Sequence, residues 1–331
     1  MTPDAPARTT LDKATDENFP VAPFFLPRAW RADLMAVYGF ARLVDDIGDG
    51  DLAPGGADAR LLGARPGDGP HALLDALEAD LSRVFDEAPG TPVAPAALGA
   101  SEAPGVPVAP AALGASEAPG VPVAPAHPLL AALRPTVRRH ALGPAPFRAL
   151  IEANRQDQRV RRYATHDDLL AYCELSANPV GRLVLAISGT ATPERTRHSD
   201  RICTALQIVE HLQDVAEDLR RDRIYLPAED MARFHVTEAD LAAPTANASV
   251  RALVAYEARR ARDLLDEGAP LVRSVHGRLR LLLTGFVAGG HAALDALRAA
   301  RYDVLPGPPR ASGHHLLRRA GAVWRAARGE G

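Results

Sequence analysis

Cysteine and tryptophan are rare in this sequence, and their scarcity already excludes some classes of protein. Each occurs twice in 331 residues, and aromatic residues account for only 5% of the chain. The two cysteines, Cys173 and Cys203, are too few for a disulfide framework and too widely spaced for a zinc knuckle. We therefore expect two buried thiols in a protein of the reducing cytoplasm.

A surplus of one charge and long apolar runs are also absent. The 38 basic and 41 acidic residues give a net charge of −3, which provides no electrostatic basis for nucleic acid as the main partner. The longest uncharged apolar run covers only residues 281–294, whereas a membrane span needs about 20 residues. Because the N-terminus also lacks the apolar core of a signal peptide, we expect a cytoplasmic protein in which 281–294 is a buried helix.

One segment consists of a repeated unit. The sequence PVAPAALGASEAPGV occupies residues 92–106, recurs at 107–121 and begins again at 122–126. The unit is rich in proline and glycine and has no aromatic residue, so it cannot bury enough surface to offset the entropy lost on ordering. We interpret residues 88–127 as a disordered surface insertion between two helices, without a function of its own.

The rest of the chain has helical periodicity. Apolar residues recur at spacings of three and four, proline and glycine fall between the periodic segments, and no convincing strand pattern appears. Hydrophobic residues make up 47% of the chain, which is enough for a substantial core. We predict an all-α protein with a single domain over residues 1–331, interrupted by the insertion. The predicted helices cover 31–49, 71–86, 128–141, 146–160, 166–188, 196–221, 248–267 and 276–302.

The predicted helix at 31–49 carries a polar stripe inside an apolar segment. At about 100° per residue, Tyr38, Arg42, Asp45 and Asp49 fall within about 60° of one another. Carboxylates four residues apart repel each other and destabilise a helix slightly unless a cation lies between them. Taken alone, such a cluster is most simply a solvated helix face.

A second predicted helix, 196–221, repeats the pattern. Gln207, Glu210, Asp214 and Asp218 fall within about 80° of one another, opposite an apolar stripe. If the two helices face each other across a bundle, they enclose a cavity with two acidic walls. Magnesium binds through one or two carboxylates and completes its octahedron with water and phosphate oxygens, so a Mg²⁺-bound diphosphate is the fitting ligand.

The residues alone leave three interpretations open. Carboxylates, a metal and arginines in an apolar bundle suit the ionisation of an allylic diphosphate, because the metal stabilises the leaving group and the cavity excludes water. A structural network of salt bridges and another metal chemistry are the alternatives. The arginines that could neutralise phosphate charge are Arg42, Arg220, Arg221 and Arg223.

Three motifs in these segments resemble the squalene/phytoene synthases. They are YGFARLVDDIGD at 38–49, YCELSANPVGRLVL at 172–185 and QDVAEDLRRDRIYLP at 213–227. The resemblance runs from about residue 14 to 306 and implies the all-α class I terpenoid synthase fold, a helical bundle with a central cavity. Three stretches, 17–27, 151–173 and 176–185, favour the hydroxysqualene synthase branch of bacterial hopanoid biosynthesis.

The resemblance also implies roles for individual residues. Glu210 departs from the family pattern, since relatives commonly have a metal-contacting Asn at that position. Tyr302 would lie on a C-terminal helix near the substrate, and Thr15 and Asn18 on an N-terminal segment that covers the diphosphate. The implied metal ligands are Asp45, Asp49, Glu210, Asp214 and Asp218; the implied catalytic residues are Tyr38, Arg42, Tyr172, Asn178 and Gln207; and the implied substrate-binding residues are Thr15, Asn18, Tyr38, Arg42, Gln207, Arg223, Tyr225 and Tyr302.

Four further features have two interpretations each. Asp46 lies about 100° from the Asp45–Asp49 line, so it either supports the ligands or is solvated. Asn178 either positions a water or forms a turn before Pro179, and His211 is interpreted as packing or surface. The basic C-terminal tail at 307–331 contains an amphipathic segment, 314–329, that either contacts an anionic membrane or packs on the body.

The implied reaction is Mg²⁺-dependent conversion of presqualene diphosphate into hydroxysqualene, with two or three metal ions and no NADPH. Serine and asparagine at 176 and 178 can hold a water where an alanine–glycine pair could not. The alternative in the same family is condensation of two prenyl diphosphates to presqualene diphosphate, dehydrosqualene or phytoene. A family member without catalytic activity is a further alternative, which the two intact acidic clusters disfavour.

Overall fold

The computed structural model describes residues 10–11, 23–52, 56–65, 67–86 and 124–327. Over these ranges every regular element is a helix, and one isolated parallel bridge joins Arg162 to Ile224. The predicted all-α class is confirmed. The helices are α2 Arg28–Gly48, α3 Ala57–Leu61, α4 Pro70–Phe85, α5 Pro128–His140, α6 Ala145–Arg159, α7 His166–Ser176, α8 Asn178–Ile187, α9 Pro193–Gln213, α10 Val215–Arg220, α11 Ala228–Arg233, α12 Glu238–Leu241, α13 Ala248–Gly268, α14 Pro270–Ser274, α15 Gly277–Ala299 and α16 Gly313–Ala326.

Two of the predicted helices are each broken into two, so their predicted continuity is wrong. The segment 166–188 divides at Ala177, where Pro179 lies in the first turn of α8 and has no N–H to continue α7. The segment 196–221 divides at Asp214, which has φ −105° and ψ 14° and belongs to neither α9 nor α10. The second acidic cluster therefore spans a bend rather than one straight helix face.

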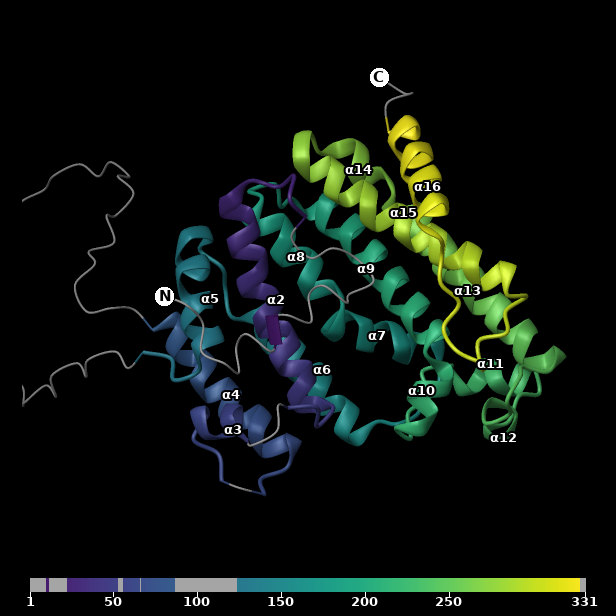
Figure 1. Ribbon diagram of the computed structural model, residues 1–331, viewed down its shortest axis with the longest axis horizontal. Coiled ribbons are helices and arrows are strands. Elements are labelled where there is room, and N and C mark those ends of the chain that lie inside the picture. The colour runs from purple at the N-terminus through teal and green to yellow at the C-terminus, as the bar shows by residue number, and fades with distance from the viewer. Residues whose placement is uncertain (1–9, 12–22, 53–55, 66, 87–123, 328–331) are drawn as a thin grey trace, which may run out of the picture.

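Helix α9 lies inside the bundle, and α2 and α13 lie on either side of it (Figure 1). It packs against α7, α8, α13, α14 and α15, whereas α2 packs against α4, α5, α6 and α8. Gly181 of α8 permits close approach to α9, because a Cβ there would lie 2.3 Å from Ser199 Oγ and 2.6 Å from Cys203 Sγ. Both cysteines are free thiols; Cys173 is buried and Cys203 is partly exposed.

The C-terminal part of the chain packs on the body. Helix α16 lies against α15 (Figure 1), where the buried Asp295 carboxylate accepts hydrogen bonds from Arg319 Nε at 2.6 Å and His315 Nε2 at 2.7 Å. Leu317 of α16 nevertheless stays 73% exposed. Helix α15 contains the predicted buried run 281–294 and ends at Ala299, so Tyr302 lies in a turn with φ +58° and not on the helix. Within the described ranges, no helix is both long and apolar enough to cross a membrane.

The repeated segment lies almost wholly outside the described residues, because 87–123 are not described. The end of the segment, at residues 126–127, is anchored by a buried cluster, so the prediction of disorder is wrong there. The Asp80 carboxylate on α4 accepts hydrogen bonds from the backbone N–H groups of Ala126, at 2.8 Å, and His127, at 2.9 Å. The fully buried His127 ring also pairs with Asp58 at 3.1 Å. The chain at the end of the insertion therefore lies against α4, the helix that precedes the insertion.

Candidate active site

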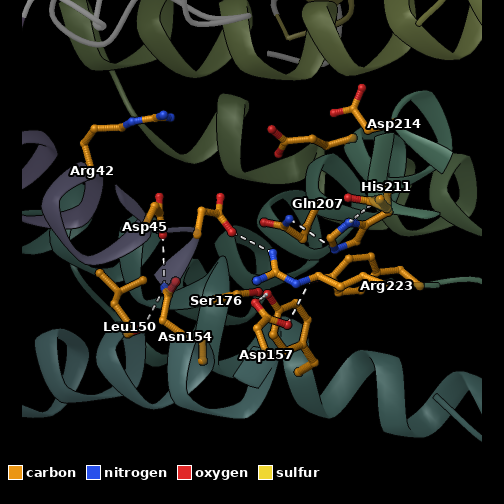
Figure 2. Close-up of a pocket in the computed structure, with 16 residues that line it drawn as sticks. Arg42, Asp45, Leu150, Asn154, Asp157, Ser176, Gln207, His211, Asp214 and Arg223 are labelled. Atoms are coloured by element: carbon orange, nitrogen blue, oxygen red, sulfur yellow. Dashed lines mark hydrogen bonds and ion pairs between the residues drawn. The ribbon is translucent and has the colours of Figure 1, made fainter. Parts of the chain in front are cut away.

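A polar pocket lies where α2, α6, α7 and α9 meet (Figure 2). Among the described residues that line it, Leu150 and Ala153 supply the only two aliphatic side chains. The pocket therefore suits the charged end of a ligand better than a hydrocarbon chain. The lining residues are Arg42, Asp45, Asp49, Leu150, Ala153, Asn154, Asp157, Tyr172, Ser176, Gln207, Glu210, His211, Asp214, Asp218, Arg223 and Tyr225.

The two acidic clusters meet in this pocket. Asp45 and Asp49 line it from the end of α2, and Glu210, Asp214 and Asp218 line it from α9, the bend and α10. Figure 2 shows Asp45 and Asp214 on opposite sides. The structure therefore brings together all five residues that were predicted as metal ligands, and their role as ligands stays a prediction.

The pocket holds more negative than positive charge. Six carboxylates line it, against the two arginines Arg42 and Arg223. The protein atoms packed around Asp45 raise the pKa of its carboxyl, and the charges of Asp49 and Glu210 add to the rise. Burial likewise raises the pKa of Asp214, with a further contribution from Asp218 and Glu217. An anionic diphosphate can therefore enter only together with cations.

The donor set fits magnesium bound jointly by protein and substrate. Among the described residues, no three His, Cys, Asp or Glu side chains are close enough to hold one ion by themselves. Each wall offers carboxylate oxygens, the hard ligands that Mg²⁺ prefers, and leaves coordination positions for water and phosphate. Residues Asp45 and Asp49 on one wall and Glu210, Asp214 and Asp218 on the other would hold the ions.

Two arginines bridge the acidic walls. Arg223 Nη1 donates to Asp49 Oδ1 at 2.6 Å, and Arg221 Nη1 lies 2.9 Å from Asp49 Oδ2. Of Arg220, Arg221 and Arg223, only Arg223 lines the pocket. Arg220 Nε donates a hydrogen bond to the backbone oxygen of Ala216. Arg223 is therefore the arginine of this segment that can reach a bound phosphate.

Two neighbouring contacts hold the first acidic wall in place. Arg42 Nε donates to Asp46 Oδ1 at 2.9 Å, and Asp46 is only 3% exposed. Asp46 therefore supports a pocket residue, and its interpretation as a solvated side chain is wrong. On α6, Asn154 Nδ2 donates to Asp45 Oδ1 at 3.1 Å. Gly48 makes room for Asn154, because a Cβ at this position would lie 2.0 Å from its Oδ1.

Aromatic side chains form the floor of the pocket. The buried Asp157 carboxylate accepts hydrogen bonds from Tyr172, at 2.7 Å, and from Tyr225, at 2.9 Å. His211 stacks on Tyr225 with ring centroids 3.7 Å apart, and its Nε2 lies 3.2 Å from Gln207 Nε2. His211 therefore packs against an aromatic ring, as one of its two interpretations held, and it also lines the pocket.

Several predicted site residues do not line the pocket. Asn178 is 4% exposed, and both ends of its amide are engaged: Nδ2 donates to Glu174 at 2.8 Å, and Oδ1 accepts from Thr204 at 3.0 Å. Asn178 joins α8 to α7 and α9 through these two contacts, and its catalytic role stays a prediction. Tyr302 lies in the turn after α15 and does not line the pocket, and its role as a substrate contact stays a prediction.

Tyr38 lies one turn before Arg42 on α2 and does not line the pocket either, and its catalytic and substrate-binding roles stay predictions. Thr15 and Asn18 lie outside the described residues. The structure adds three polar pocket residues that the sequence did not single out as site residues, Asn154, Asp157 and His211, and it places Ser176, which was predicted to hold a water, in the pocket as well. Asn154 and Asp157 lie one turn apart in the polar run ANRQDQR (153–159), and this run was the one sequence signal for them.

Comparison with known proteins agrees with this geometry. The squalene/phytoene synthase family model matches residues 12–318. The chain is 31% identical to the hydroxysqualene synthase of Rhodopseudomonas palustris, over 78% of this chain and 72% of the relative. It is 27% identical to the 15-cis-phytoene synthase of Synechococcus elongatus, over 92% and 91%.

Among solved structures, the squalene synthase HpnC from Alicyclobacillus acidocaldarius is 36% identical and superposes with a TM-score of 0.66, covering 89% of this chain and 95% of that one. The matched family model spans the helices that build the pocket. The similar proteins include both hydroxysqualene and phytoene synthases. The chain belongs to the squalene/phytoene synthase family of isoprenoid synthases and resembles its hydroxysqualene synthase branch.

Proposed function

We propose that this enzyme ionises presqualene diphosphate with Mg²⁺ and releases hydroxysqualene. The observation that carries the proposal is the meeting of two carboxylate walls and two arginines above a floor of tyrosines. Hydroxysqualene synthases among the relatives support the choice of substrate. A structural salt-bridge network accounts for the Asp49–Arg223 pair alone, but not for the accumulation of six carboxylates in one pocket.

The arginines and carboxylates hold the diphosphate. Arg42 and Arg223 can each donate to phosphate oxygens from opposite sides of the pocket. When Mg²⁺ is bound, it neutralises the leaving diphosphate and so lowers the barrier to breaking the carbon–oxygen bond. Asp46 keeps the Arg42 guanidinium in place, and Asn154 does the same for the Asp45 carboxylate.

The second half of the reaction is capture of the cation. Loss of diphosphate leaves a cyclopropylcarbinyl cation that rearranges to an allylic cation on the squalene skeleton. Addition of one water and release of one proton then give the alcohol. Ser176 lines the pocket, and its buried Oγ finds no hydrogen-bond partner in the described part of the chain. It supports the proposal because an unsatisfied hydroxyl can hold that water.

Incubation of the purified enzyme with presqualene diphosphate in ¹⁸O-labelled water tests the proposal. We expect hydroxysqualene that carries the label, formed only with Mg²⁺ and equally well without NADPH, as detected by mass spectrometry. An unlabelled product, or squalene that appears only when NADPH is added, would contradict the assignment. A parallel incubation with farnesyl diphosphate addresses the alternative, condensation of two prenyl diphosphates, which the phytoene synthase relatives favour.

Contact with a membrane surface is part of the same proposal. Helix α16 presents Leu317 together with the exposed arginines Arg318 and Arg325, a combination that suits anionic lipid headgroups. Sedimentation with anionic phosphatidylglycerol vesicles, compared with sedimentation with phosphatidylcholine vesicles, tests this membrane contact. We expect binding to the anionic vesicles that Leu317→Ser weakens; equal binding of the variant would contradict the assignment.

A further inference from the structure

Asp157 is the one carboxylate of the pocket that belongs to neither acidic cluster. It lies on α6, is 6% exposed, and accepts a hydrogen bond at each of its oxygens. Tyr172 on α7 donates to Oδ2 at 2.7 Å, and Tyr225 in the segment after α10 donates to Oδ1 at 2.9 Å. One side chain thus links three parts of the fold at the floor of the pocket.

This arrangement fixes the direction of both phenol protons. A phenol has one proton to donate and two lone pairs to accept with. Because each proton points to Asp157, the face of each hydroxyl oxygen that remains available to the pocket carries lone pairs. A diphosphate needs hydrogen-bond donors and is repelled by these oxygens, whereas a carbocation is attracted to them.

Ring packing makes the orientation rigid. The Tyr172 and Tyr225 rings lie 5.5 Å apart, and Tyr163 packs against both, at 5.5 and 5.6 Å. Tyr163 does not line the pocket, and its hydroxyl accepts a long hydrogen bond, 3.4 Å, from Gln156. Burial raises the pKa of Tyr172 and of Tyr225, and the nearby Asp157 charge raises both further, so the phenols stay protonated.

We propose that Asp157 is a positioning residue that orients the hydroxyls of Tyr172 and Tyr225 so that their oxygens, rather than their protons, face the cationic intermediate. The proposal deepens the proposed function and rests on its ionisation step. It assigns the diphosphate to the end of the pocket lined by the two acidic clusters and Arg42, and the developing cation to the end lined by the tyrosines. Asp157 acts in the transition state and contributes little to substrate binding.

The test is a double-mutant cycle of Asp157→Asn with Tyr172→Phe. An amide at 157 can accept from only one tyrosine and must present N–H groups to the other, so one phenol loses its orientation. We expect kcat to fall by about 10- to 100-fold, the loss of one or two charge-assisted hydrogen bonds, with KM within about threefold. In the Tyr172→Phe background the same change should cost less than about threefold, because the amide oxygen can then accept from Tyr225, the one phenol that remains.

Tyr163→Phe is the matched control, since it keeps the stacked ring outside the pocket and should retain kcat within about threefold. Additive losses in the cycle, or an Asp157→Asn enzyme with normal kcat, would overturn the proposal. Should Asp157→Asn fail to fold, Tyr225→Phe decides: a lower kcat at constant KM supports the proposal, and an unchanged kcat or a change in KM alone overturns it.

All rates are measured as diphosphate release from whichever of presqualene and farnesyl diphosphate the wild type consumes. The identity of the wild-type product tests the proposed function, whereas the cycle compares variants on that same substrate. The two proposals can therefore fail separately.

Discussion

Replacement of Asp45 by asparagine should make the protein more stable and at the same time inactive. Its carboxyl pKa rises from 3.8 to about 7 in the fold, chiefly through the surrounding protein. Between these values the unfolded chain has released a proton that the folded chain retains, so wild-type stability falls as pH rises through this window. Asp45→Asn removes the group that causes this loss.

The size of the gain follows from that rise in pKa. It would correspond to about 4 kcal/mol for a fully enclosed group, since one pKa unit equals about 1.4 kcal/mol. Asp45 opens onto the pocket and is exposed there, so solvent screening reduces the expected gain to about 1 kcal/mol. The melting temperature in EDTA at pH 7.5 should rise by about 2 °C for a chain of this size.

In the presence of Mg²⁺ and inorganic diphosphate, the wild type should instead be the more stable of the two proteins. A ligand present at about 100 times its dissociation constant stabilises the wild type by about 2.7 kcal/mol, and a variant that binds about 100-fold more weakly loses nearly all of this. Turnover should fall at least about 100-fold, or about 2.7 kcal/mol in activation free energy. Asp51→Asn is the control, because Asp51 pairs with Arg221 at 3.2 Å but does not line the pocket.

Three results would refute this reasoning: a lower melting temperature of Asp45→Asn in EDTA, an undiminished thermal shift with Mg²⁺ and diphosphate, or more than about a tenth of wild-type turnover. The first would mean that the charged carboxylate stabilises the fold. The second and third would mean that Asp45 takes no part in holding the metal–diphosphate group.

Three further predictions concern other parts of the chain. Ser176→Ala should raise the ratio of dehydrosqualene to hydroxysqualene, measured by mass spectrometry, by at least about fivefold, while the rate of diphosphate release stays within about threefold. An unchanged product ratio would exclude Ser176 as the group that holds the water. Deletion of residues 92–121 shortens the connection 87–123 from 37 to 7 residues. The free energy of unfolding, measured in urea, should rise by about 1.5 kcal/mol, and activity should stay normal. A loss of stability or of activity would show that the segment packs on the body. Glu257 is 1% exposed, and burial, with Asp230 nearby, raises its pKa above the ordinary 4.5. Because the folded chain then binds more protons than the unfolded chain, the stability of the wild type should fall from pH 5 to pH 8, and that of Glu257→Gln should fall less. Parallel curves of stability against pH for the two proteins would contradict the assignment.

Helical periodicity was sufficient to predict the fold class and most of the helices. Apolar spacing reports which face of a segment is buried, and that is a local property of the sequence. The break at Asp214 was not predictable in this way, because VEHLQDVAEDL at 209–219 keeps a helical pattern through the bend. Pro179 signalled the other break, yet proline is tolerated in a first turn and does not by itself show where the preceding helix ends.

The site was predictable where it consists of charged groups on apolar helices and unpredictable where it depends on tertiary packing. Asp45 and Asp214 stood out because acid in a buried pattern needs a cation. Asp157 did not, because its neighbours Gln156 and Gln158 give it the pattern of a solvated face. Only the approach of α7 and of Tyr225 buries it between two phenols.

The bend at Asp214 connects the fold to the chemistry. If α9 continued straight, Asp218 and the residues after it would move away along the helix axis by about 1.5 Å per residue. The bend, followed by the end of α10 at Arg220 and a turn at Asp222 with φ +58°, instead returns the chain, so that Arg221 and Arg223 reach Asp49 on the opposite wall and Tyr225 reaches Asp157 on the floor. The guanidinium groups of Arg221 and Arg223 offset the charge of Asp49, and Arg223 also lines the pocket. Under the proposed function, the same short segment therefore both balances the first acidic wall and supplies a phosphate contact.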